Sequence, residues 1–315
     1  METIYTLSEI TRNIPTIVQM DDHDYGQGNI WGAGFGHEES GRGFEKAPCV
    51  VNAAQELALG HLPDPATDDT LRNGISIHYT NYIYGKTDLA ILESRKFKNF
   101  NSANGDSVFG KDQEAWVEEW CEDQDHLKVV LIQSPLVEIA TNTSGKTGIK
   151  PLPENMYTRP QPGRDRFFDI IKGCTNMVLS GDQHLGIAVT YDDFGITECA
   201  SPAAINDYFW RLNVLPEGTT TTKPGIKYTM LKAWNVNNNL IRTFGRGHRT
   251  RWATGGHVLR SRAYGFLIAD FDGSVGTCEM HGYRAGQGKI WEVEVPALNP
   301  GLTNLQVRPR TADGE

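Results

Sequence analysis

The chain has 315 residues, of which 39% are hydrophobic and 22% are charged, as is typical of a folded globular protein rather than a disordered one. A formal net charge of -9 argues weakly against a protein whose main function is to bind nucleic acid. No apolar run approaches the roughly 18 residues needed to cross a bilayer. The N-terminus shows neither a basic region nor an apolar one, so no signal peptide is visible and the cellular location stays open.

The first elements predicted along the chain lead into a polar cluster. Thr6-Leu-Ser-Glu9 has capping-box spacing and predicts a short helix that ends before Pro15. Thr16–Met20 is rich in β-branched residues and predicts a strand, which runs directly into Asp21-Asp22-His23-Asp24-Tyr25. The loop Gly26–Gly36 follows. Glycines with this spacing also occur in loops that bind nucleotide phosphates, but no helix is predicted to begin at them. We therefore interpret the segment as a flexible loop that covers a functional site.

Strands and helices then alternate. Further helices are predicted at Pro48–Leu59, Gln113–Glu122 and Asp165–Lys172, and further strands at Ile75–Tyr84, Thr87–Leu92, Val129–Ile132, Met177–Leu179 and Ile187–Thr190, with a loop at Thr141–Pro162. In Pro48–Leu59 the expected buried face is Val50, Ala54, Leu57 and Ala58. Alternating strands and helices of this kind favour a layered α/β fold.

Beyond Ser201 the predicted elements are strands. Tyr264–Asp270 and Thr277–Tyr283 have the pattern of a β-hairpin, and Lys289–Val295 that of a further strand. We therefore divide the chain into an α/β core at residues 1–200 and a β-rich region at residues 201–315 that continues the same domain. The five cysteines are odd in number and lack Cys-x-x-Cys spacing, so we expect buried thiols rather than disulfides or a zinc ribbon.

The stretch Asn176–His184 carries the clearest chemical signal. A buried strand stops at Ser180-Gly181 and presents Asp182 and His184, a carboxylate and an imidazole suited to a metal ion. Open α/β sheets place their ligands at this edge, although an ordinary polar turn has the same pattern. The segment from Thr16 to Tyr25 repeats the arrangement. Because both strands are expected to end at one sheet edge, Asp22, His23, Asp182 and His184 should lie in one pocket.

Six short motifs, in order, resemble the PhoD-like alkaline phosphatases, a branch of the calcineurin-like metallophosphatases. They are Asp21-Asp22-His23, Glu93-Ser-Arg95, Gly110-x-x-Gln113-x-x-Trp116, Val129–Pro135, Leu179-Ser-Gly-Asp-Gln-His184 and Glu198-Cys-Ala-Ser-Pro202. The resemblance runs from about residue 10 to about residue 275. It implies two facing β-sheets flanked by helices, with N-terminal strands missing from this chain. It also implies hydrolysis of phosphoric esters, with a small phosphate ester or, as one possibility, a nucleic acid as the substrate.

The resemblance assigns roles to individual residues. Asp22, Asp182 and His184 stand where such enzymes carry metal ligands, and His23 stands where they carry the histidine next to the scissile phosphate. His23 would act as a general acid, although a solvated loop histidine fits the same pattern. The cofactors implied are divalent or trivalent metal ions, iron and calcium first, with magnesium, manganese or zinc as alternatives. Because no histidine lies near Gln133-Ser-Pro135, an oxygen-rich site for Ca²⁺ or Mg²⁺ is favoured there over one for Zn²⁺.

An arginine-rich stretch spans Arg242–Arg262. As a phosphate-facing rim it would bind substrate through Arg246, Arg249 and His257, since a guanidinium fork binds two phosphate oxygens at once. A nucleic-acid rim and a solvated, salt-bridged loop are the alternatives, and the solvated loop is slightly favoured.

Metallophosphatases also carry two motifs upstream of the position of Asp22, one of which supplies the aspartate that bridges two metals. Neither is found in the 20 residues that precede Asp21. We therefore expect this chain to correspond to the C-terminal part of such an enzyme, and on its own to bind metal poorly and hydrolyse little. The alternative from another class is a non-catalytic binding protein that keeps the fold without the metal centre.

Overall fold

The computed structural model describes residues 9, 11–25, 46–71, 74–98, 107–123, 125–137, 139, 161–202, 215–222, 225–234, 265–271, 275–282 and 288–296. The helices are α2 (Asp22–Tyr25), α3 (Pro48–Leu59), α4 (Lys111–Glu122) and α5 (Gln161–Ile171). The first eight strands are β1 (Thr80–Tyr84), β2 (Thr87–Ile91), β3 (Leu127–Leu131), β4 (Met177–Ser180), β5 (Gly186–Tyr191), β6 (Ile196–Ala200), β7 (Thr220–Thr221) and β8 (Tyr228–Trp234). The last three are β9 (Gly265–Phe271), β10 (Val275–Gly282) and β11 (Gly288–Pro296).

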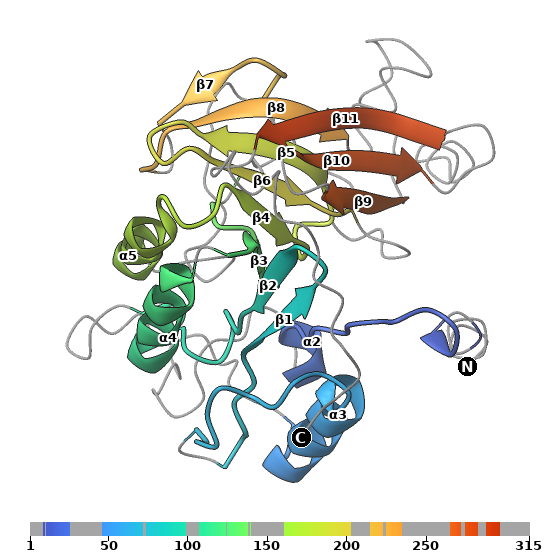
Figure 1. Ribbon diagram of the computed structural model, residues 1–315, viewed down its shortest axis with the longest axis vertical. Helices are drawn as coiled ribbons and strands as arrows, with labels where there is room; N and C mark the ends of the chain where they lie inside the picture. The colour runs from blue at the N-terminus through green and yellow to red at the C-terminus, as the bar shows by residue number, and fades with distance from the viewer. Residues whose placement is uncertain are drawn as a thin grey trace, which may run out of the picture.

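Two β-sheets form the body of the molecule (Figure 1). The large sheet has the order β1-β2-β3-β4-β6-β5-β8-β7, and the small sheet has the order β11-β10-β9. Strands β2, β3, β4 and β6 are parallel neighbours, whereas the pairings at both ends of the large sheet are antiparallel. The predicted α/β architecture with two sheets and flanking helices is confirmed.

The parallel strands of the large sheet are buried on both faces, which explains their nearly continuous apolar sequences. On β3, Val130 packs into the cluster beneath α4 and α5, while its neighbour Val129 packs into the cluster shared with the small sheet. Successive side chains on a strand point to opposite faces, so one apolar run serves two cores. The two helices therefore cover one face of the large sheet, and the small sheet covers the other (Figure 1).

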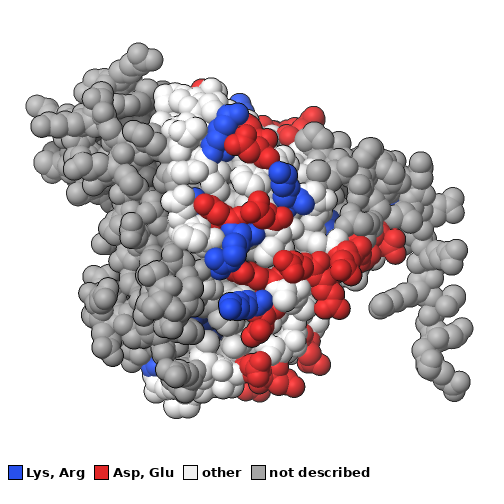
Figure 2. Space-filling view, turned by 90° about the vertical axis from the view of Figure 1, so that its left-hand side faces the viewer, with Lys and Arg blue, Asp and Glu red and all other residues white. Residues whose placement is uncertain are grey.

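Helices α4 and α5 lie side by side and present their polar faces to solvent. They are joined by an ion pair of 3.3 Å between Arg166 and Glu114. On this side of the molecule, basic side chains lie among acidic ones (Figure 2). Where this face is described, it holds no continuous basic stripe of the kind that follows a nucleic-acid backbone.

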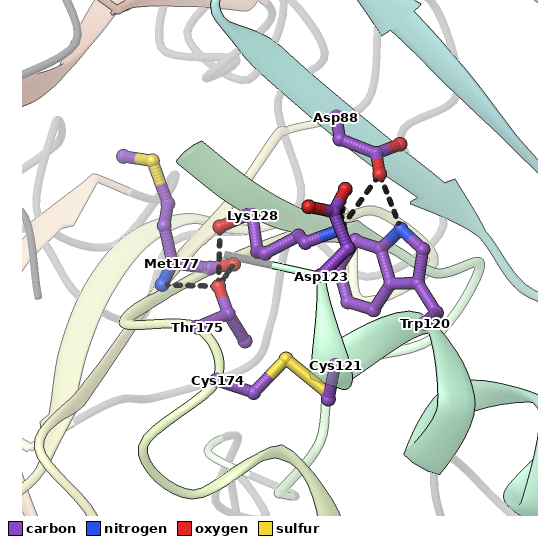
Figure 3. The surroundings of a disulfide bond; sticks show 8 residues. All are labelled: Asp88, Trp120, Cys121, Asp123, Lys128, Cys174, Thr175 and Met177. Carbon is purple, nitrogen blue, oxygen red and sulfur yellow. Dashed lines mark hydrogen bonds and ion pairs between the residues drawn. A yellow bond between two sulfur atoms is a disulfide. The ribbon is translucent and has the colours of Figure 1, made fainter. Parts of the chain in front are cut away.

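Two disulfide bonds correct the prediction of unpaired thiols. Cys121 at the end of α4 is bonded to Cys174, which follows α5 (Figure 3). Cys199 on β6 is bonded to Cys278 on β10, so this bond joins the two sheets. The partners are 53 and 79 residues apart in sequence, and such pairings depend on how distant segments pack. Cys49 is free and exposed.

A buried ion pair lies beside the first disulfide (Figure 3). Lys128 Nζ lies 2.9 Å from Asp88 Oδ2, and the indole of Trp120 donates a hydrogen bond of 2.8 Å to the same oxygen. The ammonium also lies over the Trp120 ring, 4.7 Å from its centroid. These interactions stabilise the buried ammonium group of Lys128.

Three predicted elements differ from the structure. Thr16–Met20 is not a strand: Leu92 N donates to Leu131 O, so β2 and β3 leave no gap for another strand between their ends. The segment crosses those ends, where the Gln19 amide donates to Leu92 O at 2.6 Å. Of the predicted strand Ile75–Tyr84, only the part in β1 is a strand.

The third difference concerns α3, whose bounds were predicted correctly but whose buried face was not. The residues in the core are Val51, Gln55 and Leu59, which recur every fourth position. Val50 and Leu57, expected inside, are 54% and 87% exposed. Gln55 donates a hydrogen bond to Ser76 Oγ, and Ser76 N donates one to Asn52 Oδ1. These bonds favour the observed rotation of the helix, which the hydropathy of the helix sequence does not reveal.

Candidate active site

The turn after β4 has an uncommon backbone. Among the described residues, the non-glycine residues with positive φ are Asp182 (58°) and His184 (55°). Gln183 N donates to Gly181 O at 2.6 Å, which closes a three-residue turn around Asp182. Such conformations cost about 1–3 kcal/mol each and cluster at functional sites, where they aim a side chain.

Two further carboxylates meet Asp182 at this edge of the sheet. Asp21 follows the extended segment anchored by Gln19, and Asp22 begins α2. Asp21 N donates to Asp24 Oδ2 at 2.8 Å, which helps to hold the chain at its entry into α2. Each of Asp21, Asp22 and Asp182 offers a carboxylate oxygen, and these oxygens lie within 4.8 Å of one another. We call these three side chains the acidic cluster.

Arg95 reaches into the acidic cluster from the segment after β2. Its Nε lies 2.5 Å from Asp21 Oδ1, and its Nη2 lies 2.7 Å from Asp182 Oδ1, while its side chain is fully buried. Burial by itself would lower the pKa of Arg95, but the carboxylates of the cluster outweigh that effect and raise it. The guanidinium is therefore a permanent cation between two of the three acids.

Three buried side chains hold the backbone that carries Arg95. Glu93 Oε1 accepts the N–H of Arg95 at 2.7 Å. Gln113 on α4 bonds both to the N–H of Glu93, at 2.8 Å, and to its carbonyl, at 2.9 Å. Gln133, just beyond β3, accepts the N–H of Ser94 at 2.8 Å. The motifs Glu93-Ser-Arg95, Gly110-x-x-Gln113 and Gln133-Ser-Pro135 thus form one hydrogen-bonded network that positions Arg95.

The acidic cluster fits a metal ion. Asp182 Oδ2 is buried and has no hydrogen-bond partner among the described residues, so an acceptor remains available. Burial raises the pKa of Asp182 to about 7, with Arg95 opposing the rise and the other two acids adding to it. A bound cation would favour the ionised form of Asp182 and occupy the acceptor that Arg95 leaves open. Carboxylate oxygens are the donors that hard cations prefer.

The structure brings together some of the residues singled out in the sequence. Asp22 and Asp182 lie in the acidic cluster, whereas His184 lies in the same turn as Asp182 but is not among the residues whose ligand atoms converge there. His23 lies in α2, but its side chain is outside the described part of the structure. Arg246, Arg249 and His257 also lie outside the described residues.

Sequence reasoning did not assign three of the site's charged residues: Asp21, Arg95 and Lys98. Asp21 adjoins the chosen Asp22, and Arg95 closes the quoted motif Glu93-Ser-Arg95, so local signals existed for both. Lys98 carried no such signal. It lies three residues after Arg95 and has a fully buried side chain.

The acidic cluster lies beyond the carboxyl ends of the parallel strands, which is where open α/β sheets place their ligands. The chain matches the PhoD-like phosphatase family over residues 4–229 and belongs to that family. No curated protein matches it. In the described part of the chain, no helix combines the length and apolar character needed to span a membrane.

Two solved structures match part of this chain. The structure of PhoD shares 17% sequence identity with a TM-score of 0.43, and the match covers 68% of this chain and 51% of that one. A purple acid phosphatase from yellow lupin (Lupinus luteus) seeds shares 11% identity with a TM-score of 0.43, covering 78% of this chain and 38% of that one. This chain therefore spans about half the length of the PhoD structure.

Proposed function

We propose that this protein hydrolyses phosphoric esters, as an alkaline phosphatase or phosphodiesterase, with a metal ion held by the acidic cluster. The observation that carries the proposal is the convergence of three carboxylates within 4.8 Å, one of them on a strained turn. Arg95 pairs with two of these acids and offsets only part of the repulsion among the three, so a bound metal ion would stabilise their arrangement further. Membership of the PhoD-like phosphatase family supports the reaction class.

The residues that would hold the metal are Asp22 and Asp182, with Asp21 as a third oxygen donor and His184 as a nitrogen donor. The oxygen-rich set suits iron, calcium, magnesium or manganese better than zinc. When bound, such an ion polarises a phosphoryl oxygen and lowers the pKa of nearby water.

The chain's own residues would then orient the reaction. Arg95 spans two of the acids, at 2.5 Å and 2.7 Å, and keeps their carboxylates in a fixed relation. His23, next to Asp22 in α2, is proposed to donate a proton to the leaving alkoxide. Arg246, Arg249 and His257 are proposed as a rim that binds substrate phosphate.

The test replaces Asp182 by Asn, because asparagine tolerates positive φ and keeps the turn while removing the charge. We expect Asp182→Asn to weaken binding of Ca²⁺ or Fe³⁺ by roughly tenfold or more, measured by calorimetry. Turnover of p-nitrophenyl phosphate and bis-p-nitrophenyl phosphate should fall with it. The control is Asp169→Asn on α5, where the carboxylate is exposed. Unchanged metal affinity in Asp182→Asn would rule out the acidic cluster as the metal site.

The number of ligands sets how many ions the described residues can hold. Each of two paired cations needs roughly four to six ligands, whereas the described part of the chain offers Asp21, Asp22, Asp182 and His184. We therefore expect these four side chains to hold one cation rather than a pair. Calorimetry that finds two ions bound would show that other groups complete the site.

One observation favours the second candidate, a binding protein without catalysis. Arg95 already pairs with two of the three acids, so part of the charge is balanced from within the chain. A binding protein would bind phosphate without added metal and would show no turnover under any of the conditions above. Phosphate binding that requires metal would exclude it.

A further inference from the structure

Lys98 differs from the other buried lysines that the structure describes. Lys96 Nζ lies 3.3 Å from Glu93, and Lys128 Nζ lies 2.9 Å from Asp88, so each has a carboxylate partner. The Lys98 side chain is also fully buried, yet its Nζ has no hydrogen-bond partner among the described residues. A buried ammonium without hydrogen bonds costs several kcal/mol, so folded proteins seldom keep one without a reason.

The surroundings of Lys98 are those of the proposed active site. Its charge is affected by Arg95 and by all three acids of the acidic cluster, and burial together with Arg95 lowers its pKa well below the usual range. Arg95 likewise keeps a buried nitrogen, Nη1, without a hydrogen-bond partner among the described residues. Lys98 Nζ and Arg95 Nη1 are thus two buried donors without acceptors among the described residues, and both belong to side chains that interact electrostatically with the acidic cluster. An anionic ligand with several oxygens would supply the acceptors.

We propose that Lys98, together with Nη1 of Arg95, binds the terminal oxygens of the substrate phosphate and makes the site selective for phosphomonoesters over diesters. This inference rests on the proposed function and deepens it. A monoester carries two negative charges over three non-bridging oxygens, whereas a diester carries one charge over two. A monoester therefore offers a third non-bridging oxygen to a second donor, whereas a diester carries its second ester group at that position.

The test measures binding of two analogues that contain no ester bond and so cannot be hydrolysed. Phenylphosphonate is a dianion at mildly alkaline pH and stands for a monoester, and ethyl(phenyl)phosphinate, with two phosphorus–carbon bonds, is a monoanion of similar shape that stands for a diester. Calorimetry gives both affinities with the metal that supports turnover, or with Ca²⁺ if none does. We expect wild type to prefer phenylphosphonate. Lys98→Met should weaken phenylphosphonate binding by about 10- to 100-fold, the range of a hydrogen bond to a charged group, and ethyl(phenyl)phosphinate binding by no more than about threefold.

Two variants separate this effect from a loss of folding. Lys98→Arg keeps the positive charge and should retain much of the preference for phenylphosphonate. Lys96→Met removes a neighbouring buried lysine that is paired with Glu93, and should leave the preference unchanged even if stability falls. Thermal unfolding of Lys98→Met should be no worse than that of wild type, because methionine fills the same space without an unpaired charge.

The outcomes distinguish this inference from the proposed function. If wild type binds neither analogue, or if Lys98→Met weakens both equally, the role of Lys98 is wrong. The same conclusion follows if Lys96→Met removes the preference as Lys98→Met does. If the phosphonate preference depends on Lys98 but no phosphoric ester is ever turned over, the inference stands as a binding property and the hydrolase proposal fails.

Discussion

Replacing Glu198 by Gln should change how the stability of this protein depends on pH. Glu198 lies on β6 with its side chain fully buried. Its carboxyl group accepts hydrogen bonds from Ser180 Oγ at 2.5 Å, from the Tyr191 hydroxyl and from Leu136 N at 3.2 Å. These partners belong to the end of β4, to β5 and to the loop after β3, so this one side chain ties together the strands behind the Asp182 turn. Glutamine has the same shape but cannot ionise.

The magnitude follows from the pKa of Glu198. Burial raises this pKa from 4.5 to about 7, against the opposing effect of the three hydrogen bonds. Below pH 4.5 the group is protonated in both the folded and the unfolded chain, and it contributes nothing to the pH dependence. As the pH rises from 4.5 to about 7, the unfolded chain releases the proton while the folded chain retains it, so stability falls. The full loss, about 2.5 pH units at 1.36 kcal/mol each, is about 3 kcal/mol and is complete above pH 7.

The assay is urea unfolding of wild type and Glu198→Gln at several pH values. Other titrating groups contribute equally to both proteins, so the difference between their free energies of unfolding isolates Glu198. We expect this difference to move in favour of the variant by about 3 kcal/mol between about pH 4.5 and about pH 8. A difference that stays constant over this range, or that moves in favour of wild type, would refute the reasoning. It would mean that the hydrogen bonds hold Glu198 ionised in the folded chain.

Two further predictions concern the site and the cross-links. In an active form of the protein, His184→Ala should lose metal and turnover together, whereas His23→Ala should keep the metal and lose about 100-fold in kcat. Metal analysis that finds normal occupancy after His184→Ala would contradict the first assignment. Thiol titration of the chain, unfolded without reductant, should find Cys49 alone reactive, and five reactive thiols would contradict both disulfides. Cys121→Ser, which opens a loop of 53 residues to Cys174, should lower the free energy of unfolding in urea by about 4 kcal/mol.

The amino-acid sequence by itself determined which strands form the centre of the large sheet and where they end. The apolar runs at β3 and β4 can be recognised without knowing their neighbours, because a strand covered on both faces is mostly apolar. The polar groups that follow them, such as Asp182, could be placed at a sheet edge because they come directly after the apolar runs end. The bounds of α3 were readable from Pro48 and Gly60, whereas its rotation was not.

Only the tertiary structure decided which groups meet. Thr16–Met20 has the composition of a strand, but β2 and β3 already pair directly, so the segment crosses their ends instead. The disulfide partners lie 53 and 79 residues apart, and no local pattern couples such positions. Arg95 and Lys98 are charged residues in a segment between predicted elements, where side chains are usually exposed, yet both are fully buried. Whether a charge is buried depends on the opposite charges that distant segments bring to it, and that information lies in the packing of the chain rather than in its neighbouring residues.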